Sequence, residues 1–275
     1  MGISLLSGKG VEPKDYLIWD ADRESPVNSG PALQHAFNQN RYSGDYTTEI
    51  TPYLNSLHSY CAVFVCLGYP SDHTLIYDTM AVVKAFVNYL DSGGKVYIEG
   101  GDSWTAWDDP YTQLHERFYI EGNENNGLSD PLYGSFDKIS QNMLISYTED
   151  DNWIDSTAIL SPIEIHFINW PPYYIFAVSY EDLGIGYKTI SAAFAFGGIV
   201  NNSYFEKPIE AKTILADSMM YYFGCSTPLT HRIFETFSID LLEEFVFPQL
   251  TLPNPKPPTV ISLTSPSPFR EFVHP

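Results

Sequence analysis

A short turn of small and polar residues is the part of this sequence best suited to present a reactive group. The apolar run Lys95 to Glu99 ends in Gly100-Gly101, which Asp102 and Ser103 follow. In α/β enzymes, a tight strand-to-helix bend of this kind raises one side chain above the sheet edge as a nucleophile. Ser103 would serve an esterase-like hydrolase, with Asp102 as a further polar group and a base among His73, His115 and His166, of which His73 lies beside the turn if the strands are parallel. The alternative is that Ser103 caps the next helix or satisfies loop backbone groups.

Three carboxylates form a second set of candidates. Asp20 and Asp22 follow the apolar run Tyr16 to Trp19, and Asp102 follows the run that ends at Glu99. If these runs are parallel strands, their carboxyl ends meet at the sheet edge where ligands commonly bind. Carboxylate oxygens favour Ca²⁺, which would hold the three side chains together. Otherwise Asp20 and Asp102 accept backbone N–H groups at helix starts, and no cofactor is needed.

Three aromatic residues form a third set of candidates. Trp104, Trp107 and Tyr111 follow the turn at spacings that place them on one face of a helix. Exposed, they would form a platform for a sugar ring and make the chain a carbohydrate-binding module. Buried, they would form a packing stripe, because helical core positions show the same spacing.

The elements that must position these residues alternate along the first half of the chain. Predicted strands span residues 16–19, 46–51, 61–68 and 95–99, and predicted helices span residues 30–40 and 75–90. The short connections between strands and helices are typical of a parallel sheet covered by helices on both faces.

The second half adds strands and a closing helix. We predict a helix over 111–118, strands over 143–147, 163–167, 173–178 and 189–196, and a helix over 206–223. The acidic segments 121–130 and 149–151 are predicted as solvated turns.

The C-terminal part is rich in proline. Residues 248–275 hold 8 of the 20 prolines, a density that breaks helices and removes the N–H donors that strands need. We therefore predict a domain over 1–224, an extension over 225–247 and a proline-rich tail or linker over 248–275.

The order of these elements resembles the class I glutamine amidotransferase-like fold. More narrowly, it is similar to a divergent branch found as modules in large secreted bacterial proteins. The resemblance covers roughly residues 14–224 and implies a mainly parallel, flavodoxin-like sheet of order 2-1-3-4 with later strands added. The residues that carry it are Asp20 and Asp22, Val63 to Gly68, Tyr89-Leu90, Gly93-Gly94, Gly100-Gly101-Asp102, Leu132-Tyr133-Gly134, Thr189 to Phe196 and Tyr222-Phe223-Gly224.

The resemblance also implies where a catalytic triad would lie. Amidotransferases of this class need a cysteine at the strand-to-helix turn, and a histidine and a glutamate after a late strand. Here Gly100 to Trp104 contains no cysteine, and the later run reads Phe196-Gly197-Gly198-Ile199. The resemblance therefore predicts a fold without glutaminase activity.

Composition restricts the partners and the compartment. With 34 acidic and 14 basic residues the formal net charge is −20, which argues against nucleic acid. No run of about 18 apolar residues occurs, so we expect no membrane insertion. An aromatic content of 15% and a charged content of 17% resemble secreted or cell-surface proteins.

The three cysteines fit neither a disulfide framework nor a zinc pattern. Cys61 and Cys66 lie on opposite faces of one predicted strand and cannot pair. We predict that all three cysteines are buried apolar thiols.

The leading hypothesis is a non-catalytic accessory module of a secreted or cell-surface protein. It would bind, or act as a spacer among, other domains of the same polypeptide, cell-surface components or polysaccharide. A hydrolase that uses Ser103 and a histidine, and a carbohydrate-binding module, are the alternatives.

Overall fold

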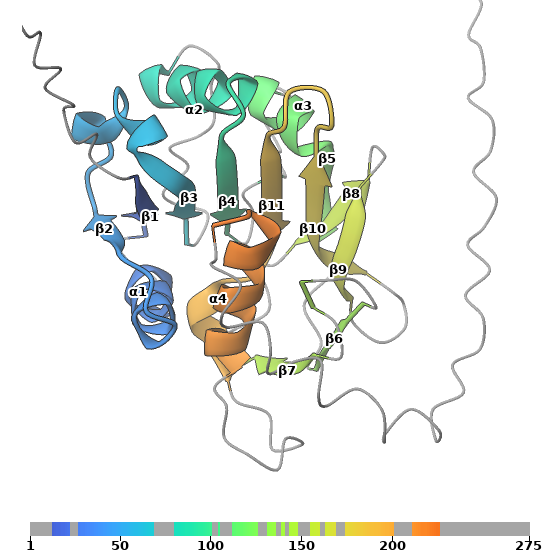
Figure 1. Ribbon diagram of the computed structural model, residues 1–275. Helices are drawn as coiled ribbons and strands as arrows, with labels where there is room; N and C mark the ends of the chain where they lie inside the picture. The colour runs from blue at the N-terminus through green and yellow to red at the C-terminus, as the bar shows by residue number, and fades with distance from the viewer. Residues whose placement is uncertain are drawn as a thin grey trace, which may run out of the picture. The chain divides into compact units, whose positions relative to one another are not determined.

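The described part of the protein centres on a ten-stranded sheet flanked by helices, as the computed structural model shows (Figure 1). The structure describes residues 13–22, 27–68, 80–100, 104, 112–125, 131–135, 139–140, 143–147, 155–159, 163–168, 174–200 and 211–225. This arrangement confirms the predicted α/β class.

The first half of the chain forms the parallel part of the sheet. Its elements are β1 (Lys14–Asp20), α1 (Ser29–Gln39), β2 (Gly44–Thr47), β3 (Tyr60–Cys66), α2 (Ala81–Asp91) and β4 (Lys95–Glu99), with short 3-10 turns at Thr51–Tyr53 and Leu57–Ser59. The strands lie side by side in the predicted order β2, β1, β3, β4, and all are parallel. β3 is almost wholly apolar because both of its faces are covered.

The second half makes the sheet mixed. It contributes α3 (Gln113–Phe118), β5 (Ile120–Asn125), β6 (Leu132–Gly134), β7 (Leu144–Tyr147), β8 (Asp155–Ile159), β9 (Glu164–Ile168), β10 (Ile175–Glu181), β11 (Lys188–Ala192), the 3-10 turn η5 (Phe196–Gly198), β12 (Ile199–Val200) and α4 (Ala211–Tyr222). The sheet order is β12-β7-β6-β9-β10-β11-β4-β3-β1-β2, and β5 pairs separately with β8.

The prediction of a mainly parallel sheet was wrong for this half. β11 is parallel to β4, but the pairs from β11 through β10, β9, β6 and β7 to β12 are antiparallel. The reason is the short connection between β10 and β11, which is too short for a crossover and leaves only a hairpin.

Several short strands were not predicted. β5 overlaps the segment 121–130 that was assigned to a solvated turn, and β6, β8 and β12 had no predicted counterpart. The sequence of β5, IEGNEN, has little apolar alternation, so its extended form depends on pairing with β8 rather than on its own composition.

Two apolar clusters cover the two faces of the sheet. Side chains of α1 and α4, such as Phe37 and Met219, belong to one cluster, and side chains of α2 and α3, such as Phe86 and Phe118, belong to the other. Alternate residues of β3 divide between them, with Phe64 in the first. Each helix pair therefore covers one face (Figure 1).

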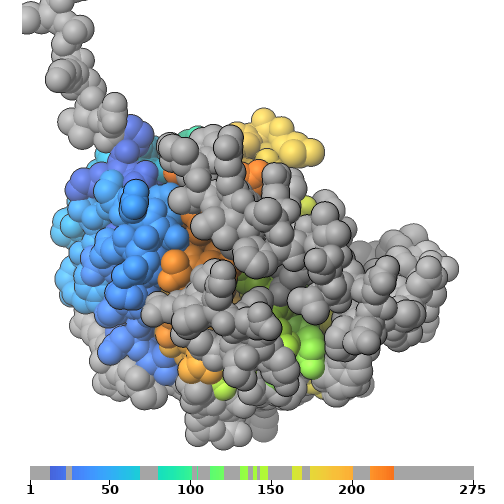
Figure 2. Space-filling view, turned by 60° about the horizontal axis from the view of Figure 1, so that its bottom comes forward, coloured from blue at the N-terminus to red at the C-terminus, as the bar shows by residue number. Residues whose placement is uncertain are grey.

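A polar bridge holds α1 beside α4. The Tyr42 hydroxyl, just after α1, donates to Asp217 Oδ1 at 2.6 Å, and Asn40 Nδ2 donates to the Thr213 carbonyl at 2.8 Å. Figure 2 shows α4 in orange beside the blue N-terminal part. The closing helix is thus fixed to the end of the first helix through Thr213 in its first turn and Asp217 near its middle.

A disulfide fixes the other end of α4 and corrects the prediction of three free thiols. Cys61, in β3, is bonded to Cys225, with 5.7 Å between their Cα atoms and a separation of 164 positions in the sequence. Cys66 is free and buried, as predicted. The pairing was missed because only the folded chain brings Cys225 to the start of β3.

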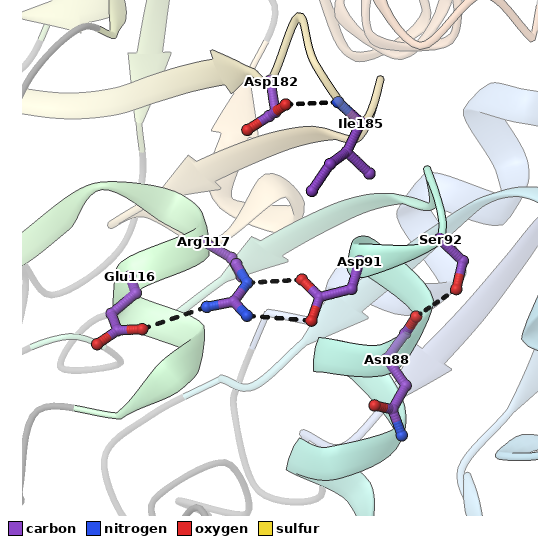
Figure 3. A network of polar contacts seen from close by, with 7 residues as sticks. All are labelled: Asn88, Asp91, Ser92, Glu116, Arg117, Asp182 and Ile185. Carbon is purple, nitrogen blue, oxygen red and sulfur yellow. Dashed lines mark hydrogen bonds and ion pairs between the residues drawn. The ribbon is translucent and has the colours of Figure 1, made fainter.

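Ion pairs join α2 to α3 on the second face. Arg117 donates to both carboxylate oxygens of Asp91, from Nε at 2.8 Å and Nη2 at 3.0 Å, and contacts Glu116 at 3.2 Å (Figure 3). Nearby, Asp182 accepts the Ile185 N–H and closes the β10–β11 turn (Figure 3). A cation shared by two acids reduces local repulsion in this acidic chain.

The chain divides into two units, residues 1–230 and 231–275. The second unit lies outside the described residues, as do the predicted proline-rich tail over 248–275 and most of the extension over 225–247. Among the described helices, none has the length and apolar character that crossing a membrane requires.

The first apolar cluster predicts a large effect of one substitution. Phe37 is fully buried, and its ring centroid lies 4.7 Å from those of both Tyr16 and Phe64. We expect Phe37→Ala to lower the free energy of unfolding by roughly 3–5 kcal/mol, because it leaves a cavity between α1 and the sheet. Urea denaturation measures this, with the exposed Gln39→Ala of the same helix as control. Equal effects of the two substitutions would contradict the assigned core.

Candidate functional site

Three polar residues lie in one row at the carboxyl ends of the central strands. Asp20 of β1 is the register partner of Cys66 of β3, and Cys66 is the partner of Glu99 of β4. All three are buried, with exposed fractions of 5%, 0% and 0%. This row occupies the edge at which ligands bind in open α/β sheets.

Glu99 connects the end of β4 to the turn η5. Its Oε2 accepts the Tyr97 hydroxyl at 2.6 Å and the Phe196 N–H of η5 at 2.9 Å. Burial raises the pKa of Glu99 from 4.5 to about 7. Hydrogen bonds from Ser29, Tyr97 and Phe196 lower that pKa, and the nearby charge of Asp20 raises it. The carboxyl group therefore exchanges its proton near neutral pH.

Asp20 is the second buried acid. Tyr46 of β2 donates its hydroxyl to Asp20 Oδ2 at 2.5 Å. Burial raises the pKa of Asp20, and the neighbouring charge of Asp22 raises it further. A Cβ atom at Gly30 would lie 2.5 Å from Oδ2 of Asp20. Only glycine therefore lets the start of α1 approach this carboxylate so closely.

Cys66 lies between the two acids. Burial raises the pKa of its thiol, and the charges of Glu99 and Asp20 raise it further. Such surroundings keep a thiol protonated and disfavour its use as a nucleophile.

The turn η5 lies against this row. Phe196 is fully buried, and Gly197 donates its N–H to Ser29 Oγ at 2.9 Å. Lys212 of α4 donates from Nζ to the Gly197 carbonyl at 2.6 Å. A Cβ atom at Gly197 would lie 2.5 Å from Val27. The turn is thus held tightly against the start of α1.

Chemically, the row offers a buried carboxyl group that titrates near neutral pH, which general acid–base catalysis also requires. Across the residues that the structure describes, no three His, Cys, Asp or Glu side chains are arranged to hold a metal ion. Of the predicted Ca²⁺ ligands, Asp20 and Asp22 are close in space, whereas Asp102 lies outside the described residues.

The predicted hydrolase residues Ser103, His73 and Asp102 all lie outside the described residues. For the predicted sugar platform, Trp107 and Tyr111 do so as well.

Trp104 is described, and it is not a platform. It is only 8% exposed, with its ring 4.9 Å from Phe118 and 5.2 Å from His115 between centroids. The indole packs in the cluster under α3, which is the alternative that its helical spacing allowed.

Glu99 and Cys66 were missed as members of the site. The signal was present, because an acid that ends a buried apolar strand directly before Gly100-Gly101 has no solvent within reach. Tyr46 and Ser29 gave no such signal, since only the register of β2 and the position of α1 bring them to the acids.

Comparison with known proteins gives the fold only. Neither a protein-family model nor a curated protein matches the sequence. Among solved structures, the chain is similar to the mmIFT52 N-terminal domain, with a TM-score of 0.51 and 14% identity over 77% of this chain and 98% of that one. It is also similar to a putative ThuA-like protein from Bacteroides uniformis, with a TM-score of 0.49 and 12% identity over 81% of this chain and 95% of that one.

Glu99 predicts a pH dependence of stability. Its folded pKa is raised from 4.5 to about 7, so the folded state binds the proton more tightly and loses stability as pH rises across that window. We expect Glu99→Gln to remove a loss of roughly 3 kcal/mol between pH 4.5 and pH 7.5. Urea denaturation at several pH values measures it, with the exposed Glu164→Gln of β9 as control. A difference between wild type and Glu99→Gln that stays constant with pH would contradict the assignment.

Proposed function

We propose that this chain is a non-catalytic accessory module of a secreted or cell-surface protein, built on a divergent amidotransferase-like sheet. It would bind other domains of the same polypeptide, cell-surface components or polysaccharide, or act as a spacer between domains. The amidotransferase-like fold family and the location outside the cell are both part of what we propose.

One observation carries the non-catalytic part: the turn η5 is bonded to the row of polar residues at the sheet edge. Phe196-Gly197-Gly198 stands where the resemblance places the histidine and glutamate of a triad. Its N–H groups bind Glu99 and Ser29, so these polar groups serve the fold. A substrate would have to displace a turn that Lys212 also holds.

The disulfide supports the proposed location. Cys61 and Cys225 form a bond that persists in oxidising compartments and is rare in the cytosol of most organisms. Closing a loop of 164 residues restricts the unfolded chain strongly. The bond would thus suit a module that must stay folded outside the cell.

An activity screen tests the non-catalytic part. We expect wild type, Ser103→Ala and Asp102→Asn to hydrolyse p-nitrophenyl acetate and glutamine at the same background rate, because the proposal gives Ser103 no catalytic role. A rate at least tenfold lower in Ser103→Ala, with an unchanged melting temperature, would overturn it.

A thiol count tests the location. In protein isolated from its natural source and denatured without reductant, we expect one alkylatable thiol, that of Cys66, by mass spectrometry. Reductant should lower the free energy of unfolding by up to about 5 kcal/mol in wild type, and leave Cys61→Ala/Cys225→Ala unchanged. Three free thiols in the natural protein would contradict an oxidising location.

A further inference from the structure

We propose that the Cys61–Cys225 disulfide is a site of thiol–disulfide exchange, in which a partner dithiol attacks Cys225 and Cys61 departs as a thiolate held by Lys95. This inference concerns the reactivity of the bond and does not depend on the proposed location.

The geometry places one ammonium group beside Cys61. Lys95 is the first residue of β4, and its Nζ lies 3.6 Å from Cys61 Sγ. Lys188, the first residue of β11, is the register partner of Lys95. Because β3, β4 and β11 are parallel, their starts lie at one edge of the sheet, and Lys95 begins β4, the strand next to the one that carries Cys61. Cys61 and Cys225 are both half-buried.

The charges around Lys95 favour a new anion. Lys188 has an acidic partner, Glu181, at 3.2 Å, and its Nζ also donates to the Tyr222 carbonyl at 3.0 Å. Among the described residues, no carboxylate pairs with Lys95 in this way. Burial lowers the pKa of Lys95, and the charge of Lys188 lowers it further. A thiolate at Cys61 would supply the negative charge that this half-buried ammonium lacks.

The asymmetry sets the direction of attack. In exchange, the thiol that is better stabilised as a thiolate leaves faster. Cys61 has the ammonium of Lys95 within reach, so Cys61 is the leaving group and Cys225 Sγ is the sulfur attacked.

The exchange balances in two steps. A thiolate of the partner bonds to Cys225 Sγ, the Cys61–Cys225 bond breaks, and its electron pair stays on Cys61. The second thiol of the partner loses its proton to solvent and attacks the partner sulfur of the mixed disulfide. Cys225 leaves as a thiolate and takes up a proton. The protein disulfide gains two electrons, and the partner dithiol is oxidised to a disulfide.

Reduction would release only one end of α4. The middle of α4 stays fixed to the end of α1 through Asp217 and Tyr42. The covalent connection between β3 and Cys225, directly after α4, would be lost. Exchange would thus change how the closing helix ends without removing the helix from the sheet.

Trapping on the wild-type chain tests the direction. With reduced glutathione as the probe at pH 7, quenched with acid, we expect the mixed disulfide on Cys225 by peptide mass spectrometry. An adduct mainly on Cys61 would overturn the proposal. This measurement needs no variant, so it holds even if a substitution weakens the fold.

Matched lysine variants test the cause. We expect Lys95→Met to slow reduction by dithiothreitol roughly threefold or more, and the exposed Lys84→Met of α2 to leave the rate unchanged. In Cys225→Ala, the pH midpoint of Cys61 alkylation should lie below about 8.5, and Lys95→Met should raise it. Equal rates for the two lysine variants, or a midpoint that Lys95→Met does not move, would overturn the role of Lys95.

Discussion

The buried carboxyl group of Glu99 is the interaction on which the path of the chain after β11 depends. It ends β4, the last strand of the first half, and accepts the N–H of Phe196, which follows β11 in the second half. A carboxyl group with no exposed surface is costly to leave without partners, because burial removes its hydration. The path of the chain after β11 is therefore restricted to one that returns a donor to Glu99, and η5 is that path.

The same restriction explains the glycines around the row of polar residues. Gly30 permits the start of α1 to lie against Asp20, and Gly197 permits η5 to lie against that start. A larger residue at either position would force apart the groups that Glu99 and Ser29 hold together. The sheet edge that could receive a ligand in a related fold is thus used here for close contacts of the backbone.

The sequence predicts an element of the fold where that segment has its own apolar pattern. It does not predict the parts of the site that depend on contacts between distant segments. The unbroken apolar run of β3 and the amphipathic pattern of α2 each indicate their structure locally. β5 has no such pattern, and its extended form comes from pairing with β8. Asp20 was predicted at the sheet edge, but its partner Tyr46 depends on the register of β1 with β2. The bond from Cys61 to Cys225 depends on the whole fold, since the two lie 164 positions apart in the sequence.

The two cysteines of strand β3 have different surroundings because they lie at opposite ends of a strand in a parallel sheet. Cys61 lies near its start, where Lys95 begins the neighbouring strand β4. Cys66 lies at its end, where Asp20 and Glu99 end theirs. Parallel strands bring starts together with starts and ends with ends, so Cys61 lies near Lys95, whereas Cys66 lies between Asp20 and Glu99. A thiolate would be stabilised at the first edge and destabilised at the second, although the two cysteines share one strand.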